Sequence, residues 1–178
     1  VLDGMELAVR GEDGAQLAAG EVGEIVIRGP NVMAGYYNAP EANAEVFASG
    51  WLRSGDLGTI DADGFAYIVD RKKDVIIRGG QNIYPADIEE ELYQLAEVAE
   101  AAVIGEPDEV LGEVVVAFVA LVPGASLTVD SSLDHCRGHL ARFKLPAQIH
   151  IRPELPKGPT GKILRRALRA VAATETSD

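Results

Sequence analysis

The chain has 178 residues, of which 47% are hydrophobic and 25% are charged. This composition is ordinary for a globular protein that buries a core in one domain or in two small ones. No apolar run approaches the roughly 20 residues that a membrane-spanning helix needs, which argues against an integral membrane protein. The single cysteine, Cys136, excludes an internal disulfide and indicates a reducing cytoplasm, where we expect the protein to be free or peripheral to a membrane.

The net charge of −12 is unevenly distributed along the chain. Residues 1–70 contain 3 basic and 12 acidic side chains, whereas residues 71–178 contain 13 basic and 16 acidic ones. Nucleic-acid binding usually requires a basic face, so this acidic balance argues against it. The basic residues cluster late in the chain, where they form either local anion sites or solvated surface.

The first 70 residues are typical of short strands joined by turns. Met5, Leu7 and Val9 alternate with polar residues, and apolar runs at 24–28 and 65–69 lie next to Gly-rich turns. This pattern predicts a small barrel or sheet. Five charged residues at 70–74 then interrupt two apolar strands and indicate a domain boundary after residue 70.

Beyond that boundary the pattern alternates between strands and helices. Pro85 suits the first position of a helix, with Ile88 and Leu92 on one face. The remaining predicted elements are strands at 75–77, 101–104, 114–122 and 149–151, a helix at 131–142 and a final helix from Ile163.

Lys162 is the most informative residue of the sequence. It lies in a stretch, 155–166, that contains two prolines and two glycines and runs directly into a basic helix. Proline fixes φ and glycine permits turns that other residues resist, so the lysine is held at a set place. Such a cation suits a phosphate or a carboxylate whose charge changes during acyl activation, although a solvated loop lysine would show the same local pattern.

Two further segments indicate a nucleotide ligand. The stretch 51–56 is predicted to be a small-residue turn ending in Asp56, whose carboxylate can accept hydrogen bonds from the two hydroxyls of a ribose. A turn-capping aspartate is the alternative interpretation. Gly79 and Gly80 precede a predicted helix start, and a glycine pair allows a ligand to approach the backbone closely.

Taken in order, these motifs resemble the carboxyl-terminal part of the acyl-adenylate-forming superfamily, which includes acyl-CoA synthetases, luciferases and peptide-synthetase adenylation domains. The segments GEIVIRG at 23–29 and GYY at 35–37 are similar to the family's barrel segment. The string DRKKDVIIRGGQNIYPADIE at 70–89 looks most like fatty-acid–CoA ligases and lacks the GRxDxQVKIRG pattern of peptide synthetases. The resemblance covers nearly the whole chain.

The resemblance implies an α+β fold in two parts. Residues 1–70 would be the last strands of a small β-barrel subdomain, at the end of a large amino-terminal domain. Residues 71–178 would be a mobile carboxyl-terminal lid domain with a three-stranded sheet and helices. The implied reaction has two steps, in which a carboxylic acid attacks the α-phosphate of ATP and the thiol of CoA then attacks the resulting acyl-adenylate.

The resemblance also assigns roles to individual residues. Lys162 would bridge carboxylate and phosphate oxygens during adenylation, while Asp56 and Arg71 would contact the ribose. Lys73 would be the hinge about which the lid rotates between the half-reactions.

The same rotation would exchange the groups that face the active site. It would remove the adenylation lysine and bring Gly79 and Gly80 beside the tunnel for the pantetheine of CoA.

Some of the family's motifs are absent from the sequence. These are the phosphate loop, the Tyr-Gly-x-Thr-Glu segment with its Mg²⁺-linked glutamate, and the acyl pocket. We therefore expect a carboxyl-terminal fragment of an AMP-forming acyl-CoA ligase, inactive alone, with the Mg²⁺ ligands outside this chain.

Two other functions fit the same residues. One is an aryl-acid–CoA ligase or a luciferase-like adenylating enzyme. The other is a non-catalytic regulatory or interaction module in which a protein acetyltransferase modifies Lys162, because acetylation of this lysine is known in bacterial relatives and would remove its charge.

Two patterns suggest metal ions but are incomplete. His135 and His139 share a helix face beside Cys136, yet no third or fourth ligand follows at a suitable spacing, so no metal site is predicted. The stretch 61–64, Asp-Ala-Asp-Gly, begins like a calcium loop but lacks the later ligands and is predicted to be a hairpin turn.

Overall fold

The computed structural model describes residues 3–175. The chain divides into two compact units, Val1–Lys73 and Asp74–Asp178. This division lies three residues later than the sequence boundary at 70, because a strand continues through the charged segment to Arg71 and pairs there with Asp56.

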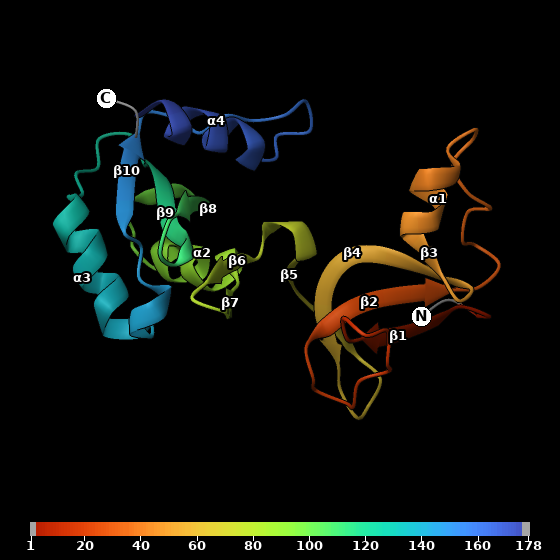
Figure 1. Cartoon of the computed structure of the whole chain (residues 1–178). Helices are drawn as coiled ribbons and strands as arrows, with labels where there is room; N and C mark the ends of the chain where they lie inside the picture. Colours follow the sequence, from red (N-terminus) through yellow and green to blue (C-terminus); the bar gives the residue numbers. More distant parts are fainter. Residues whose placement is uncertain (1–2, 176–178) are drawn as a thin grey trace. The chain divides into compact units, whose positions relative to one another are not determined.

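The first unit is a five-stranded antiparallel sheet in the order β1-β2-β4-β3, with β5 paired to β4 (Figure 1). Within the described residues β1, β3 and β5 do not pair with one another. The strands expected of the barrel segment are therefore present, but here they form an open sheet. Its elements are β1 (Glu6–Arg10), β2 (Gly23–Arg28), α1 (Pro40–Val46), β3 (Phe47–Ala48), β4 (Trp51–Ile60) and β5 (Ala66–Arg71).

The prediction of a turn at 51–56 is wrong, because these residues begin the long strand β4. Trp51 is buried and β4 pairs with three neighbouring strands, so burial and pairing override the small residues. Gly55 adopts φ +74° opposite the register shift between Glu24 and Val26, which marks a β-bulge. The small residues therefore bend a strand, visible as the curvature of β4 in Figure 1, and do not end it.

The second unit contains another five-stranded sheet, with β9 at its centre. One edge of β9 pairs with antiparallel β8 and the other with parallel β10. The resemblance implies a three-stranded sheet, which these long strands form. The sequence pattern also predicts a strand at 75–77, which corresponds to β6, and the short hairpin β6–β7 joins β9 through Arg78 and Gly112 and raises the number to five. The elements are η1 (Lys72–Asp74, at the unit boundary), β6 (Ile76–Arg78), β7 (Gln81–Ile83), α2 (Pro85–Tyr93), β8 (Val98–Asp108), β9 (Gly112–Leu121), α3 (Val129–His139), η2 (Arg142–Lys144), β10 (Gln148–Arg152) and α4 (Arg165–Glu175).

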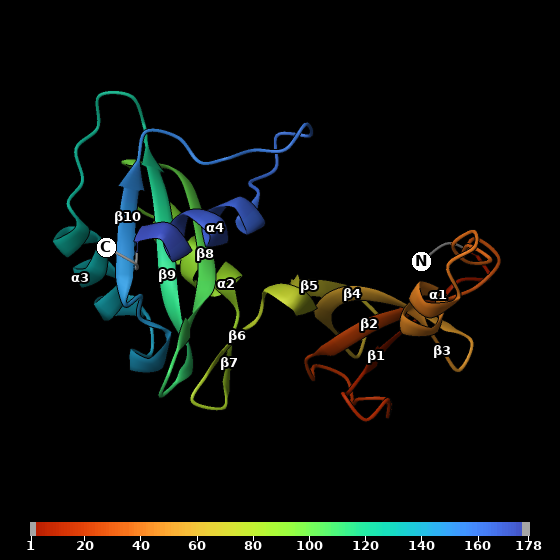
Figure 2. The same cartoon turned by 45° about the horizontal axis from the view of Figure 1, so that its top comes forward.

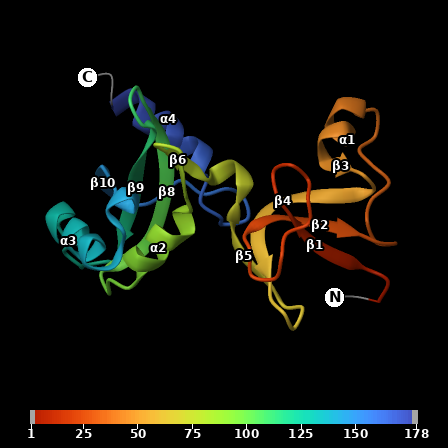
Figure 3. The same cartoon turned by 60° about the horizontal axis from the view of Figure 1, so that its bottom comes forward.

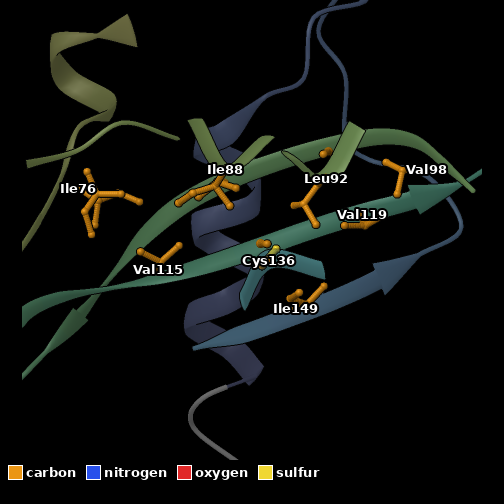
Figure 4. Packing of buried hydrophobic residues seen from close by; sticks show 12 residues of the cluster. Ile76, Ile88, Leu92, Val98, Val115, Val119, Cys136 and Ile149 are labelled. Atoms are coloured by element: carbon orange, nitrogen blue, oxygen red, sulfur yellow. The ribbon is translucent and has the colours of Figure 1, made fainter. Parts of the chain in front are cut away.

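Both faces of the second sheet are covered, so β8 and β9 are almost continuously apolar. Alternate residues such as Val103 and Val119 pack with Ile88, Leu92 and Cys136 of α2 and α3, as Figure 4 shows for much of this cluster. The other set, which includes Ile104 and Phe118, packs with Leu168 and Ala172 of α4. Figure 2 shows α4 across the face of the sheet opposite α2.

Local chemistry sets the limits of the helices. Pro85 occupies the first turn of α2, where its missing N–H costs nothing. Thr128 caps α3 by accepting a hydrogen bond from the backbone N–H of Ser131, whose side chain accepts one in return. This cap starts α3 at Val129, two residues before the prediction, and the helix ends at His139 because 142–144 form a separate 3-10 turn. No helix among the described residues is long and apolar enough to cross a membrane.

We expect Phe118→Ala to destabilise the second unit by about 3–5 kcal/mol, because it leaves a large cavity under α4. Phe118 is fully buried, whereas Val110 is 89% exposed. Val110→Ala is therefore the matched control, with an expected change within about 0.5 kcal/mol. Thermal unfolding followed by circular dichroism measures both, and equal effects would contradict the proposed core.

We expect Glu24→Gln to destabilise the first unit at pH 7 by about 1.5–3 kcal/mol, the range for hydrogen bonds to a charged group. Burial raises the pKa of Glu24, but hydrogen bonds from Arg53 and Lys72 outweigh it and hold the pKa below its ordinary value of 4.5. Because the folded-state pKa is the lower one, this stabilisation is present above about pH 4.5 and is lost as the pH falls through the folded-state pKa.

The single tryptophan, Trp51, lies in this unit, so its fluorescence during urea unfolding isolates the effect. Glu6→Gln, at an exposed ion pair with Arg28, is the control and should change the midpoint little. A wild-type to Glu24→Gln difference that persists undiminished well below pH 4 would contradict the assigned charge.

Candidate functional site

Lys162 lies on a short hairpin that precedes α4. The N–H of Gly158 donates to the carbonyl of Lys162 over 2.9 Å, and the N–H of Gly161 donates to the carbonyl of Gly158 over 3.0 Å. Gly161 adopts φ +78°, so the residues 159–161 match the three-residue hairpin loop whose last residue is left-handed. The backbone of Lys162 is thus fixed, as the sequence predicted for a loop rich in proline and glycine.

The hairpin is attached to the sheet by its two ends. Leu155 is buried in the α4-side core and Ile163 packs against the same cluster. Lys157 forms an antiparallel bridge with Ile163 and an ion pair with Glu100 of β8. Lys162 itself is exposed, with no ion-pair partner among the residues described, and Figures 1 and 2 show its loop extending from the sheet of its own unit.

Two carboxylates hold the helix that follows the hairpin. Glu89 of α2 accepts from Arg165 Nη2 at 2.7 and 2.9 Å and also accepts the backbone N–H of Val103 at 2.8 Å. Asp74 is buried, and its carboxylate lies 3.1 Å from Arg169 Nη2 and 3.6 Å from Arg165 Nη1. Buried carboxylates are retained only when they are paired and hydrogen-bonded, so α4 has a defined position relative to Asp74.

Sequence reasoning missed these positioning residues. Arg165 and Arg169 are four apart and therefore share a helix face, but the sequence gives no sign that their partners lie 76 and 95 residues away. The charged segment at 70–74 indicates only a domain boundary in the sequence, whereas Asp70 and Asp74 within it are buried. One detectable signal was that apolar Leu168 and Ala172 alternate with this basic pair along α4.

Asp56 and Arg71, both predicted to contact a ribose, lie side by side. They are register partners on β4 and β5, and Arg71 Nε lies 2.7 Å from Asp56 Oδ1. The side chain of Asp56 is 28% exposed and that of Arg71 55% exposed. The pair therefore presents a carboxylate acceptor and guanidinium donors together, which is suitable for binding vicinal hydroxyls.

Lys73 is the last residue of the first unit and is exposed within the 3-10 turn η1. Its two neighbours are held in different units. Lys72 Nζ lies 2.9 Å from Glu24 in the first unit, and Asp74 pairs with α4 in the second. Lys73 therefore lies at a junction whose flanking residues are both fixed.

Gly79 and Gly80 form the two-residue turn of the β6–β7 hairpin. Their φ values of +57° and +79° are those of a type I′ turn, which is favoured for such loops and is readily adopted by glycine. Both are exposed, and a side chain added at Gly80 would meet nothing within 4 Å. The backbone at Gly80 is thus open to a ligand, whereas the N–H of Gly79 already donates to the carbonyl of Leu111 at 2.7 Å. Both glycines are also explained by the turn itself.

The structure adds a carboxylate to the histidine pair that the sequence set aside. Glu91 of α2, His135 and His139 bring one potential ligand atom each within 4.8 Å of one another. Because Glu91 is 44 residues before His135, spacing along the sequence could not reveal it. Cys136, between the histidines, is fully buried in the core.

The family comparison covers much of the second unit. Residues 87–162 match the AMP-binding enzyme C-terminal domain, a match that ends at Lys162. The match includes neither Asp56 and Arg71 of the first unit nor the glycine pair at 79–80.

Individual relatives extend the similarity over nearly the whole chain. A long-chain-fatty-acid–CoA ligase of Yersinia pestis is 49% identical over 164 residues, covering 92% of this chain and 29% of the relative. A 2-succinylbenzoate–CoA ligase of Geobacillus kaustophilus is 46% identical over 165 residues, covering 92% of this chain and 34% of the relative. The solved structure of ATP-bound MatB from Rhodopseudomonas palustris superposes with a TM-score of 0.92 at 38% identity, covering 96% of this chain and 34% of that one.

The chain thus spans about a third of the length of the proteins it matches. It contains an AMP-binding enzyme C-terminal domain and belongs, as a carboxyl-terminal portion, to the acyl-adenylate-forming superfamily.

Proposed function

We propose that this chain is the carboxyl-terminal portion of an AMP-forming acid–thiol ligase, which converts a carboxylic acid, ATP and CoA into acyl-CoA, AMP and pyrophosphate. The observation that carries the proposal is Lys162, an exposed amine on a hairpin fixed at both ends, in a chain of this superfamily. ATP supplies the phosphate that the acid attacks, and the accompanying Mg²⁺ would be bound outside this chain.

In this proposal Lys162 acts while negative charge is redistributed between the acid and the α-phosphate. A positioned ammonium group is most useful when it faces charge that develops in the transition state, because it requires no reorganisation at that moment. The hydrogen bonds across the hairpin hold the lysine backbone before substrate arrives. Asp56 would accept hydrogen bonds from the ribose hydroxyls, and Arg71 would hold that carboxylate in its orientation.

We propose that the second unit moves as a body about Lys73. A hinge needs only a few residues that absorb the change in backbone dihedrals, and the residues beside it must belong firmly to the bodies that move. Lys72 is held by Glu24 and Asp74 by α4, which leaves Lys73 between two anchored neighbours. Because α4 directly follows the hairpin of Lys162, the Asp74 ion pairs would carry a rotation at the hinge to the catalytic lysine.

The acid is proposed to be a fatty acid or a related carboxylate, with an aryl acid as the alternative. By their names, the relatives at 46–49% identity include ligases for long-chain fatty acids, 2-succinylbenzoate and ferulate. Similar identity to ligases of such different acids indicates that the choice of acid is made outside this portion. The residues of this chain would then serve the steps that these ligases share.

A chimera tests the proposal directly. This chain would replace the matching carboxyl-terminal portion of the Yersinia pestis long-chain-fatty-acid–CoA ligase, and formation of long-chain acyl-CoA would be measured. We expect activity to be restored relative to the truncated relative, while the 178-residue chain alone gives no ATP–pyrophosphate exchange. A folded chimera without activity, or robust exchange by the chain alone, would overturn the proposal.

We expect Lys162→Ala in this chimera to lower the rate of adenylation by about 100-fold or more, the typical cost of losing one positioned charge-stabilising group. Thioester formation from supplied acyl-adenylate should change little, because the lysine faces the phosphate only in the first half-reaction. ATP–pyrophosphate exchange and acyl-CoA release measure the two steps separately. Arg166→Ala, at the next exposed cation along the chain, is the control, and equal losses in both half-reactions would contradict the role of Lys162.

Lys73→Pro should have the opposite effect, preserving adenylation and abolishing thioester formation. Proline fixes φ near −65° and so restricts the rotation between the two half-reactions. Lys73→Ala removes the same side chain without fixing φ and should retain both steps. Survival of both half-reactions in the proline variant would show that the pivot lies elsewhere.

A further inference from the structure

The geometry points to a divalent transition-metal site on the second unit, formed by Glu91 of α2 with His135 and His139 of α3. The three residues bring one ligand atom each within 4.8 Å of one another. Zinc bound by three protein ligands of this chemistry takes water in its fourth position, with metal–ligand distances of about 2.0–2.2 Å. The site does not depend on the proposed function, since none of its ligands is Lys162, Asp56 or Arg71.

The cluster lies where two helices pack together. Figure 3 shows α2 and α3 side by side along one face of the sheet, and their side chains share one buried cluster. His135 and His139 are four residues apart, so α3 presents both rings on one face, with centroids 4.4 Å apart. Glu91 faces them from α2, with its Oε2 atom 3.8 Å from His135 Nε2.

One oxygen of the Glu91 carboxylate, Oε2, is buried and has no hydrogen-bond partner among the described residues. A buried oxygen without a hydrogen-bond partner is destabilising unless a donor or a cation compensates it. His135 Nε2 is within hydrogen-bonding distance of the Glu91 backbone carbonyl, at 3.0 Å, rather than of this oxygen. A cation bound between this carboxylate and the two imidazole rings would compensate the charge of the Oε2 atom.

The hydrogen bond of His139 favours the ring form that a metal requires. Its Nδ1 atom lies 2.8 Å from the carbonyl of His135, and a carbonyl can only accept, so Nδ1 carries the proton. The Nε2 atom of His139 is then left with a lone pair. Metal-ligating histidines characteristically donate their other ring N–H to a backbone carbonyl or a carboxylate, which fixes the tautomer and the orientation of the ring.

Binding requires small local adjustments. Tetrahedral zinc places its ligand atoms about 3.3–3.5 Å apart, so the rings and the carboxylate must move closer together than they are here. His139 is exposed, so its side chain has room for a small shift, whereas Glu91 and His135 are largely enclosed. His135 would bind the metal through Nε2 after that atom loses the proton facing the Glu91 carbonyl, or it would bind through Nδ1.

The bound metal would brace α2 against α3. The helix α2 also carries Glu89, which holds Arg165 of α4, so a fixed α2 supports the base of the lysine hairpin. Imidazole and carboxylate ligands together suit Zn²⁺ better than they suit Mg²⁺, which prefers oxygen ligands and retains its water. The ion proposed here is therefore distinct in chemistry from the Mg²⁺ that accompanies ATP.

Isothermal titration of the chelator-treated chain with ZnCl₂ tests the site. We expect one Zn²⁺ per chain and a rise in the thermal midpoint at saturating metal, because the ion binds only the folded arrangement. His139→Ala should abolish the binding. Glu91→Gln, which keeps the size of the side chain, should weaken it by roughly 10-fold or more, at least what loss of a supporting hydrogen-bond partner costs.

Two variants serve as controls. His150 is the third histidine of the chain and stacks on Phe118 on the other face of the sheet, so His150→Asn should leave zinc binding unchanged. Cys136→Ala removes the only thiol and should also leave it unchanged. Circular dichroism confirms that each variant is folded.

The remaining outcomes would overturn the proposal. Absence of stoichiometric binding by the wild-type chain would exclude the site. Binding that survives Glu91→Gln unchanged would indicate a histidine pair acting alone, and binding that disappears with Cys136→Ala would indicate a thiol site.

Discussion

The arrangement of the second unit depends most on the ion pairs formed by the buried carboxylate of Asp74. A charged group with this little exposure is tolerated only if cations approach it, and Arg165 and Arg169 do so from one face of α4. The same helix continues from the hairpin that carries Lys162. The need to pair the charge of Asp74, the first residue of the unit, thus determines where Lys162 is presented near the end of the unit.

The second sheet supplies the rigid support for this arrangement. Its central strand β9 is buried on both faces, and each face is closed by different helices, α2 with α3 on one side and α4 on the other. Dense packing of this kind transmits displacements instead of absorbing them. In the proposed function, such stiffness would confine the change of backbone dihedrals to the hinge while the unit moves.

The first unit uses the same kinds of interaction for another purpose. Glu24 is almost buried and holds both Arg53 and Lys72, so the end of the unit is attached to its sheet immediately before the junction. Asp56 and Arg71 pair across adjacent strands near that junction, with both side chains partly open to solvent. The anchoring carboxylate, Glu24, is thus more buried than Asp56 of the proposed ribose-binding pair.

The sequence by itself determined most of the strands, the start of α2 and the Pro- and Gly-rich loop of Lys162, whereas the α+β class came from the family resemblance. The local features follow from periodicity and from proline and glycine geometry, which act over a few residues. Tertiary structure alone decided that 51–56 is a strand, because the burial of Trp51 and pairing on both edges outweigh local turn propensity. It alone decided that Asp74 is buried and that Glu91 lies beside two histidines, since both depend on packing between helices that no local pattern encodes.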